Sequence, residues 1–178
     1  MKKKSMPELC RISVAEYKKS NKLPVCVVAE DVRAAHNIGA MLRTADAFRI
    51  AHIYMCGITP TPPNPDIHKT ALGAEDSVEW SYSPDSLSVL RQLRDEGWTL
   101  CGLEQTHDSI PLNRYRPDKD TKVAIVTGNE VEGVSEEALA LCDHVLEIPQ
   151  HGTKHSLNVS VAAALAMYTM YLNFTNGL

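Results

Sequence analysis

Short apolar runs rich in β-branched residues alternate with helical patterns along most of the chain, and this alternation restricts the possible folds more than any other feature. The apolar runs cover residues 23–31, 52–58, 98–104, 122–128 and 144–149. The helical patterns cover residues 36–48, 83–97, 135–142 and 158–173, and a Pro-rich loop without regular structure is expected at residues 59–66. Strands that alternate with helices form units in which the strands run parallel and the helices cover the sheet. The sequence therefore predicts an α/β fold with a mostly parallel sheet and helices on both faces.

The sequence carries no feature of a membrane or secreted protein. Its 178 residues, of which 44% are hydrophobic, suit one globular core. No apolar run approaches the roughly 20 residues that cross a bilayer, and the basic start has no apolar signal-peptide region. The five cysteines are isolated from one another, as is usual in a reducing compartment. We therefore expect a cytoplasmic protein.

The first residues differ in charge from the rest of a chain whose net charge is -4. Their basic side chains are Lys2, Lys3, Lys4, Arg11, Lys18, Lys19 and Lys22. Such a segment either contacts a nucleic-acid backbone or acts as a solubilising tail. We expect a basic N-terminal arm over residues 1–22 and one domain over residues 23–178.

Four loops follow predicted strands at the edge where parallel sheets bind ligands, and they cover residues 30–37, 103–108, 128–135 and 148–158. In the last of these, His151 and His155 have the spacing of a metal-binding pair. Pro149 and Gly152 disfavour a helix there, so we predict no metal site. Ser156 has no G-x-S-x-G elbow, and we expect it to cap the following helix rather than to act as a nucleophile.

The loop at residues 128–135 resembles a phosphate-binding loop only in the spacing of Gly128 and Gly133. The Lys of that motif is replaced by Val134, and Glu130 and Glu132 stand where phosphates would lie. A nucleoside triphosphate is therefore disfavoured, since like charges repel. Either a neutral or cationic ligand binds here, or the loop is a tight turn with a solvated acidic rim.

The helix predicted at residues 36–48 has two distinct faces. Ile38, Met41, Leu42, Ala45 and Phe48 form one apolar stripe at helical spacing. Arg43 lies opposite, beside small residues (Gly39, Ala40 and Ala47) that allow a close approach by a ligand or another backbone. Arg43 is either a solvated side chain or part of a site, and Asn37 is expected to cap the start of the helix.

The last predicted helix is apolar nearly all round. Such a helix is buried within its domain or against a partner chain, and in a small protein this favours a homodimer. The alternative is one face in the core with alanines exposed.

Three segments together resemble motifs of the SpoU/TrmH group of the SPOUT methyltransferases, and the match covers residues 23–171. Residues 37–44 (NIGAMLRT) are similar to the first motif, and residues 128–133 (GNEVEG) to the second. Ile148 and Pro149 with residues 156–162 (SLNVSVA) are similar to the third.

The resemblance implies a C-terminal trefoil knot, a homodimer, S-adenosylmethionine (AdoMet) as methyl donor, and a ribose 2′-hydroxyl of RNA as acceptor. It implies a cofactor pocket formed by Leu103, Gly128, Ile148, Ser156 and Leu157. It also implies that Arg43 acts on the hydroxyl, either as a base or as a charged clamp on a phosphate. Asn37 would then orient the ribose or Arg43, Glu130 would hold Arg43, and Asn158 would hold the site together.

Two positions depart from the family pattern, because Arg49 replaces a common Gly and Gln150 replaces a common Met. The chain also lacks the extra N-terminal RNA-binding domain of many rRNA-modifying relatives, so tRNA is the favoured substrate. The alternatives are the same reaction on rRNA, a non-catalytic module that binds RNA or AdoMet, and a flavodoxin-like or nucleotide-binding α/β protein.

Overall fold

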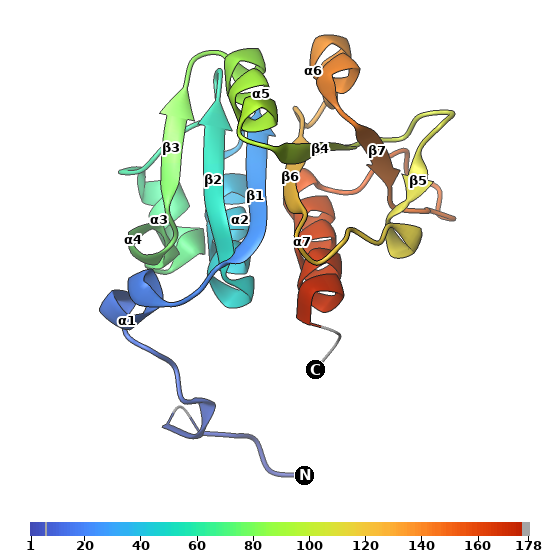
Figure 1. Cartoon of the computed structure of the whole chain (residues 1–178). Coiled ribbons are helices and arrows are strands. Elements are labelled where there is room, and N and C mark those ends of the chain that lie inside the picture. Colours follow the sequence, from blue (N-terminus) through green and yellow to red (C-terminus); the bar gives the residue numbers. More distant parts are fainter. Residues whose placement is uncertain (6, 176–178) are drawn as a thin grey trace.

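The computed structural model describes residues 1–5 and 7–175, and it contains one seven-stranded sheet (Figure 1). The strand order is β3-β2-β1-β6-β4-β7-β5, and every strand pair is parallel. The strands are β1 (Leu23–Glu30), β2 (Ile50–Cys56), β3 (Trp80–Ser83), β4 (Trp98–Leu103), β5 (Ile110–Pro111), β6 (Lys122–Thr127) and β7 (His144–Glu147). The predicted parallel α/β fold is confirmed.

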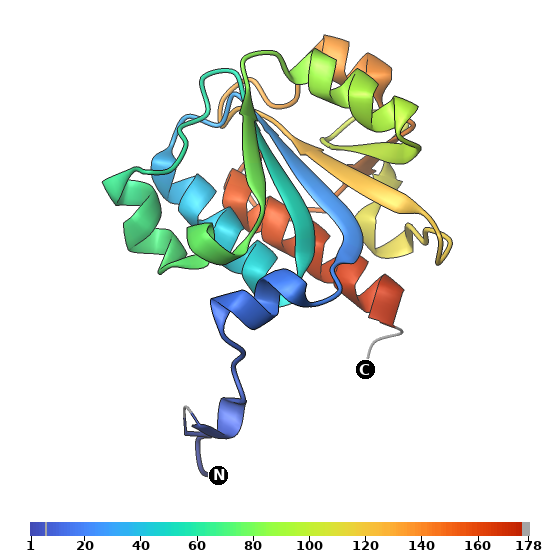
Figure 2. The same cartoon turned by 60° about the vertical axis from the view of Figure 1, so that its left-hand side comes forward.

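Helices cover both faces of the sheet, as predicted (Figures 1 and 2). One face packs against α2 (Ala35–Phe48), α3 (Pro65–Ala71), α4 (Ala74–Ser77) and α7 (Val159–Thr175). The other face packs against α5 (Ser86–Asp95) and α6 (Glu136–Leu141). The short helix α1 (Val14–Lys19) and the 3-10 turns η1 (Pro7–Leu9) and η2 (Leu112–Arg114) complete the structure.

The strand order brings distant loops together at one edge. Strand β6 lies between β1 and β4, and β7 lies on the other side of β4. All four strands are parallel, so the loops that follow them lie at the same edge of the sheet. These are the four loops in which the sequence predicts a ligand.

The two predicted faces of α2 are confirmed. Ile38, Met41, Leu42 and Ala45 are fully buried, whereas Arg43 is exposed. The close approach predicted beside Gly39 is also present, because a Cβ at Gly39 would lie 1.9 Å from Oγ1 of Thr70 and 2.5 Å from the backbone oxygen of Ile67 in α3. Only glycine allows α2 and α3 to pack at this distance.

Three local predictions are wrong. The Pro-rich loop ends early: α3 begins at Pro65, whose missing N–H is not needed in a first turn, and Asn64 caps the helix through N–H bonds from Asp66 and Ile67. Asn37 is not an N-cap, because α2 begins at Ala35. Ser156 is not the cap of α7, because Oδ1 of Asn158 accepts the N–H of Ser160 at 2.9 Å.

The last helix has one buried face and one exposed apolar face. Ala163, Ala166, Met167 and Met170 are buried against the sheet and α2. On the other face, the side chains of Val161, Leu165, Tyr168 and Leu172 are exposed, at 47%, 41%, 45% and 37%. The helix is therefore not buried all round within one chain, and its exposed face carries large apolar residues rather than alanines alone.

The N-terminal segment is partly attached to the domain. Tyr17 of α1 is 4% exposed, and its hydroxyl donates to the backbone oxygen of Ala45 at 3.4 Å.

The predicted boundary between an N-terminal arm (residues 1–22) and a domain (residues 23–178) stays a prediction, as does the trefoil knot. Residue 6 of the arm and residues 176–178 of the domain lie outside the described residues. No helix among the described residues is long and apolar enough to cross a membrane.

Candidate active site

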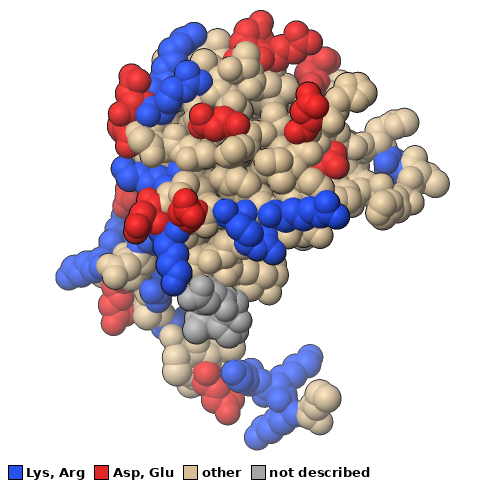
Figure 3. Space-filling model, turned by 45° about the vertical axis from the view of Figure 1, so that its right-hand side comes forward, with Lys and Arg blue, Asp and Glu red and all other residues tan. Residues whose placement is uncertain are grey.

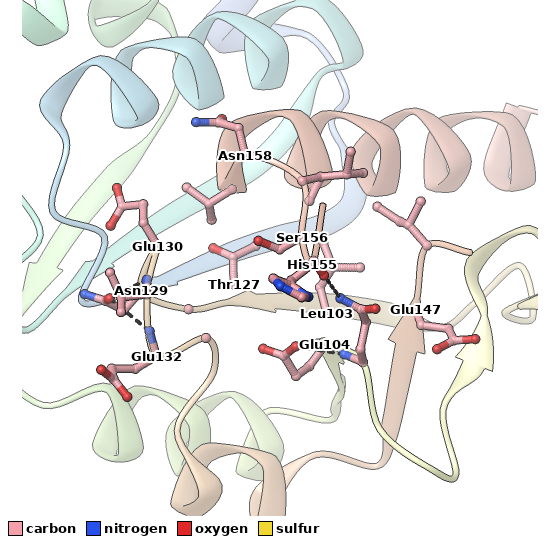
Figure 4. A pocket seen from close by; sticks show the side chains of 18 of the residues that line it. Leu103, Glu104, Thr127, Asn129, Glu130, Glu132, Glu147, His155, Ser156 and Asn158 are labelled. Carbon is pink, nitrogen blue, oxygen red and sulfur yellow. Dashed lines mark hydrogen bonds between the residues drawn. The ribbon is translucent and has the colours of Figure 1, made fainter. Parts of the chain in front are cut away.

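A cavity of about 540 Å³ opens at the carboxyl ends of β4, β6 and β7 (Figure 4). The loops after these three strands line it, together with the start of α7. All five predicted cofactor-binding residues are among its lining: Leu103, Gly128, Ile148, Ser156 and Leu157. Gln150, which departs from the family pattern, lines it as well.

Two glycines allow the turn after β6 that forms one wall of this cavity. Asn129 and Gly133 exchange two backbone hydrogen bonds of 3.0 Å, which close the turn. A Cβ at Gly128 would lie 2.0 Å from the backbone carbon and oxygen of Gly133. Gly133 itself has a φ of 74°. A side chain at Gly128 would therefore force the turn open and move Glu130 with it.

Three of the predicted catalytic residues form one hydrogen-bonded chain. The amide of Asn37 donates to Oε1 of Glu130 at 2.8 Å, and the amide of Asn158 donates to Oδ1 of Asn37 at 3.1 Å. Asn37 is 8% exposed, so its contacts are shielded from water. Glu130 and Asn158 also line the cavity. These hydrogen bonds join all three motif segments at the edge of the cavity.

The Glu130 carboxylate also holds the loop that follows β1. It accepts the N–H of Arg33 at 2.9 Å and the N–H of Ala34 at 3.0 Å. Burial on its own raises the pKa of Glu130, but these N–H groups and the Asn37 amide together hold that pKa below its usual value of 4.5. Glu130 is therefore an anion at neutral pH, and it fixes the start of α2 relative to the cavity.

Arg43 lies apart from this group. It is exposed on α2 and is not among the residues that line the cavity. The expected contact between Glu130 and Arg43 is absent from the described part of the chain, where Glu130 bonds Arg33, Ala34 and Asn37. Arg43 follows Asn37 by six positions, which places it about 240° further around the helix.

Two residues that the sequence analysis missed support the cavity from β4. Glu104 accepts the N–H of Val134 at 3.1 Å through Oε2 and the N–H of Gln105 at 2.8 Å through Oε1. The amide of Gln105 donates to the backbone oxygen of His155 at 2.8 Å. The signal was present, because two polar residues directly follow a buried strand in a loop where a ligand was expected.

The loop at residues 151–158 is exposed throughout. The hydrogen bond that Gln105 donates to His155 of this loop lies next in sequence to Ser156 and Leu157, which line the cavity. His151 and His155 lie in this loop and not on a helix. No group of three or more His, Cys, Asp or Glu side chains in the described residues could hold a metal ion.

Comparison with protein families places the motif segments in a known context. The model of the SpoU rRNA Methylase family matches residues 24–168. The chain belongs to this family. The match includes the two motif segments that line the cavity and the first motif segment, whose Asn37 is hydrogen-bonded to Glu130 and Asn158.

Two relatives of this SpoU family protein act on different RNAs. It is 34% identical to the tRNA (guanosine(18)-2'-O)-methyltransferase of Thermus thermophilus, over 90% of this chain and 81% of the relative. It is 30% identical to the 23S rRNA (guanosine-2'-O-)-methyltransferase RlmB of Vibrio parahaemolyticus, over 90% of this chain and 67% of the relative.

Solved structures share the fold of this SpoU family protein. The TrmH/SpoU tRNA modifying enzyme of A. aeolicus has a TM-score of 0.81 at 22% identity, over 92% of this chain and 83% of that chain. The SpoU methyltransferase AviRb of Streptomyces viridochromogenes, in complex with the cofactor AdoMet, has a TM-score of 0.77 at 22% identity. That match covers 91% of this chain and 65% of AviRb.

Proposed function

We propose that this SpoU family protein methylates the 2′-hydroxyl of a ribose in RNA, with AdoMet as the methyl donor. The observation that carries the proposal is that all three motif segments are joined at one cavity: the second and third line it, and Asn37 of the first is hydrogen-bonded to both. Asn37, Glu130 and Asn158 come from three distant parts of the chain and are joined by hydrogen bonds there. The family and both named relatives are methyltransferases of this reaction class.

The cavity fits AdoMet in chemistry. Its apolar lining includes Leu103, Leu146, Ile148 and Leu157, which suit an adenine ring. None of the described lining residues is Lys or Arg, whereas Glu130 and Glu132 line it, as suits a cation better than a phosphate. Leu103, Gly128, Ile148, Ser156 and Leu157 would hold the cofactor. When bound, AdoMet supplies an electrophilic methyl group.

The residues of the chain position the acceptor and support its negative charge. A guanidinium keeps its proton in proteins, so Arg43 is better suited to hold a phosphate of the RNA with two hydrogen bonds than to act as a base. A cation beside the ribose lowers the pKa of the 2′-hydroxyl. The exposed position of Arg43 supports a contact with RNA, and Asn37 and Glu130 hold the helix that carries it.

We propose that the protein acts as a homodimer through the exposed face of α7. Val161, Leu165, Tyr168 and Leu172 form an apolar strip that is costly to leave in water. Val159 and Ala162 at the start of the same helix line the cavity, so a second copy on this strip would lie beside the site. Leu165→Glu should give monomers in analytical ultracentrifugation. Leu72→Glu, at an apolar residue that is 66% exposed elsewhere, should leave the mass unchanged.

We propose tRNA as the substrate and the cytoplasm as the place of action. The relative with 34% identity modifies tRNA and is covered over 81% of its length. Lys and Arg side chains gather around the extended N-terminal segment, where they suit contacts with RNA phosphates (Figure 3). Deletion of residues 1–12 should weaken RNA binding and flatten its dependence on salt.

Methyl-labelled AdoMet and unmodified tRNA and rRNA pools, kept separate, test the reaction. Digestion and mass spectrometry of the nucleosides should find a labelled 2′-O-methylnucleoside in the tRNA pool. Arg43→Ala should still bind AdoMet and transfer no methyl group, and Arg43→Lys should be impaired because Lys cannot form the two-pronged contact. A label on a base would refute ribose methylation, and a label in rRNA alone would refute the choice of tRNA. Intact AdoMet binding without label in either pool would favour a non-catalytic module.

A further inference from the structure

Carboxylates are the main charged groups around the cavity. Glu104, Glu130, Glu132 and Glu147 line it, and among the described lining residues the only basic side chain is that of His155. Figure 4 shows three of these acids, Glu104, Glu130 and Glu132, around the turn after β6 and the end of β4. Carboxylic acids are ionised at neutral pH unless their surroundings oppose it. The cavity is therefore a negative region of a chain whose net charge is -4.

Two of these carboxylates are held in place by the fold. Hydrogen bonds from the N–H groups of Arg33 and Ala34 keep Glu130 at its position. The N–H groups of Val134 and Gln105 hold Glu104, whose Oε2 lies so close to Gly133 that a Cβ there would be 2.2 Å away. Fixed charges of this kind need little reorganisation when a cation binds.

We infer that the acidic side of the cavity, chiefly Glu104 and Glu132 beside Glu130, selects the sulfonium form of the ligand over its neutral thioether product. AdoMet then binds more tightly than S-adenosylhomocysteine, and the product leaves readily. The inference rests on the proposed function, because it concerns the ligand pair of that reaction.

The two ligands differ by one methyl group and one positive charge. In methyl transfer the bond between sulfur and the methyl carbon breaks with its electron pair left on sulfur. The methyl carbon bonds to the ribose oxygen, and the hydroxyl proton passes to solvent. The carboxylates lose their attraction to the ligand at this step. For a separation of about 7 Å and an effective dielectric of about 40 to 80, one unit charge changes affinity about three- to eightfold.

Isothermal titration calorimetry with AdoMet, S-adenosylhomocysteine and sinefungin tests the inference without RNA or turnover. Sinefungin carries a protonated amine in place of the sulfonium centre, so it reports charge without the methyl group. The wild type should bind AdoMet and sinefungin about thirtyfold more tightly than S-adenosylhomocysteine, the product of three contributions of about threefold from Glu104, Glu130 and Glu132. The double variant Glu104→Gln, Glu132→Gln should bring this preference to about threefold or less, because only the contribution of Glu130 remains.

The matched control is the double variant Glu136→Gln, Glu137→Gln, which removes the same charge from two exposed residues of α6 that do not line the cavity. Its preference should equal that of the wild type, and thermal melting should show that both double variants fold. If the cavity variant does not fold, salt serves instead: a rise from about 0.05 M to about 0.5 M should reduce the preference of the wild type, since salt screens partly exposed charges.

Equal affinity of the wild type for AdoMet and S-adenosylhomocysteine would overturn the inference and leave the proposed function intact. A preference that persists in both the cavity variant and high salt would overturn it too, because the carboxylates would not be its source. If the wild type binds none of the three ligands, the proposed function fails and the inference fails with it.

Discussion

Helix α2 meets α7 near both of its ends, and the two contacts differ in kind. At the first end, which lies beside the cavity, the Asn158 amide donates to Asn37 at 3.1 Å, and Asn37 donates to Glu130 at 2.8 Å. At the far end, the ring of Phe48 lies 5.4 Å from that of Tyr168 and 5.3 Å from that of Tyr171. One pair of helices is thus joined by polar side chains at one end and by aromatic rings at the other.

The difference separates two tasks. Partly buried polar groups add little net stability, because they exchange bonds with water for bonds with each other, but they fix positions and charges. Aromatic contacts bury apolar area and stabilise without placing a reactive group. Changes at the first end should therefore affect catalysis, and changes at the far end should affect the free energy of unfolding.

The largest effect is expected from Glu130→Gln. The substitution removes the charge and one of two acceptor oxygens, so the N–H groups of Arg33 and Ala34 and the Asn37 amide are left to compete for a single neutral oxygen. We expect the methylation rate in single turnover to fall about a hundredfold or more, as for other preorganised charged groups in active sites. Urea unfolding should change by less than about 1 kcal/mol. A rate close to that of Glu136→Gln would contradict the catalytic role of the first end.

Phe48→Ala should have the opposite profile. It removes a partly buried ring from two aromatic contacts, and we expect a loss of about 2 to 3 kcal/mol in the free energy of unfolding. The single-turnover rate, measured well below the melting temperature, should stay within about threefold of the wild type. Phe48→Leu keeps most of the volume and should cost less than about 1.5 kcal/mol. A large loss of rate at unchanged stability would erase the distinction between the two ends.

Acid should weaken the first end alone. The pKa of Glu130 lies below its usual value of 4.5 in the folded protein, so the folded state holds the proton more weakly than the unfolded chain does. Its contribution is present above pH 4.5 and is lost as the pH falls through the lower folded-state pKa. Cofactor affinity, followed by calorimetry, should show a step in that range that is absent in Glu130→Gln. If Glu130→Gln shows the same pH-dependent change in cofactor affinity, another carboxylate causes that change.

The smallest effect is expected at Arg49, just beyond the aromatic end. Arg49 closes α2 with a φ of 53°, a left-handed conformation that is costly for residues other than glycine. Arg49→Gly should stabilise the fold by about 0.5 to 1 kcal/mol in urea unfolding. Ala47→Gly, at an exposed position inside the same helix, should destabilise it by about 1 kcal/mol. If Arg49→Gly also weakens RNA binding, the arginine contacts RNA; a stability loss would refute the strain argument.

The long apolar runs made the core of the fold predictable, because strands such as β1 and β6 are buried on both sides. The sequence patterns did not indicate α1, α3, α4, β3 or β5, which are short elements. Trp80–Ser83, for example, is only four residues long and pairs with β2 alone. The strand order was out of reach as well, since β6 lies between β1 and β4 through pairings with distant segments.

The site was predictable as a set of segments but not as a set of contacts. Motif resemblance selected Asn37, Glu130 and Asn158, and the structure joins them. Local rules gave Asn37 the wrong role, because α2 begins two residues before it and its partner Glu130 is 93 residues away in the sequence. They also could not indicate that Glu130 bonds the backbone N–H groups of Arg33 and Ala34 instead of the Arg43 side chain.

The hydrogen bond between Asn37 and Asn158 spans 121 positions of the chain, and this has a consequence for synthesis on the ribosome. Strands β1 and β2 emerge early and can pair with each other, but the site needs α7, which is made after all seven strands. A nascent or prematurely terminated chain that ends before Asn158 lacks Asn158 and α7, so it cannot form the site even if part of its sheet has formed. The chain must therefore be translated through α7 before it can act on RNA, and translation that stops earlier yields inert fragments.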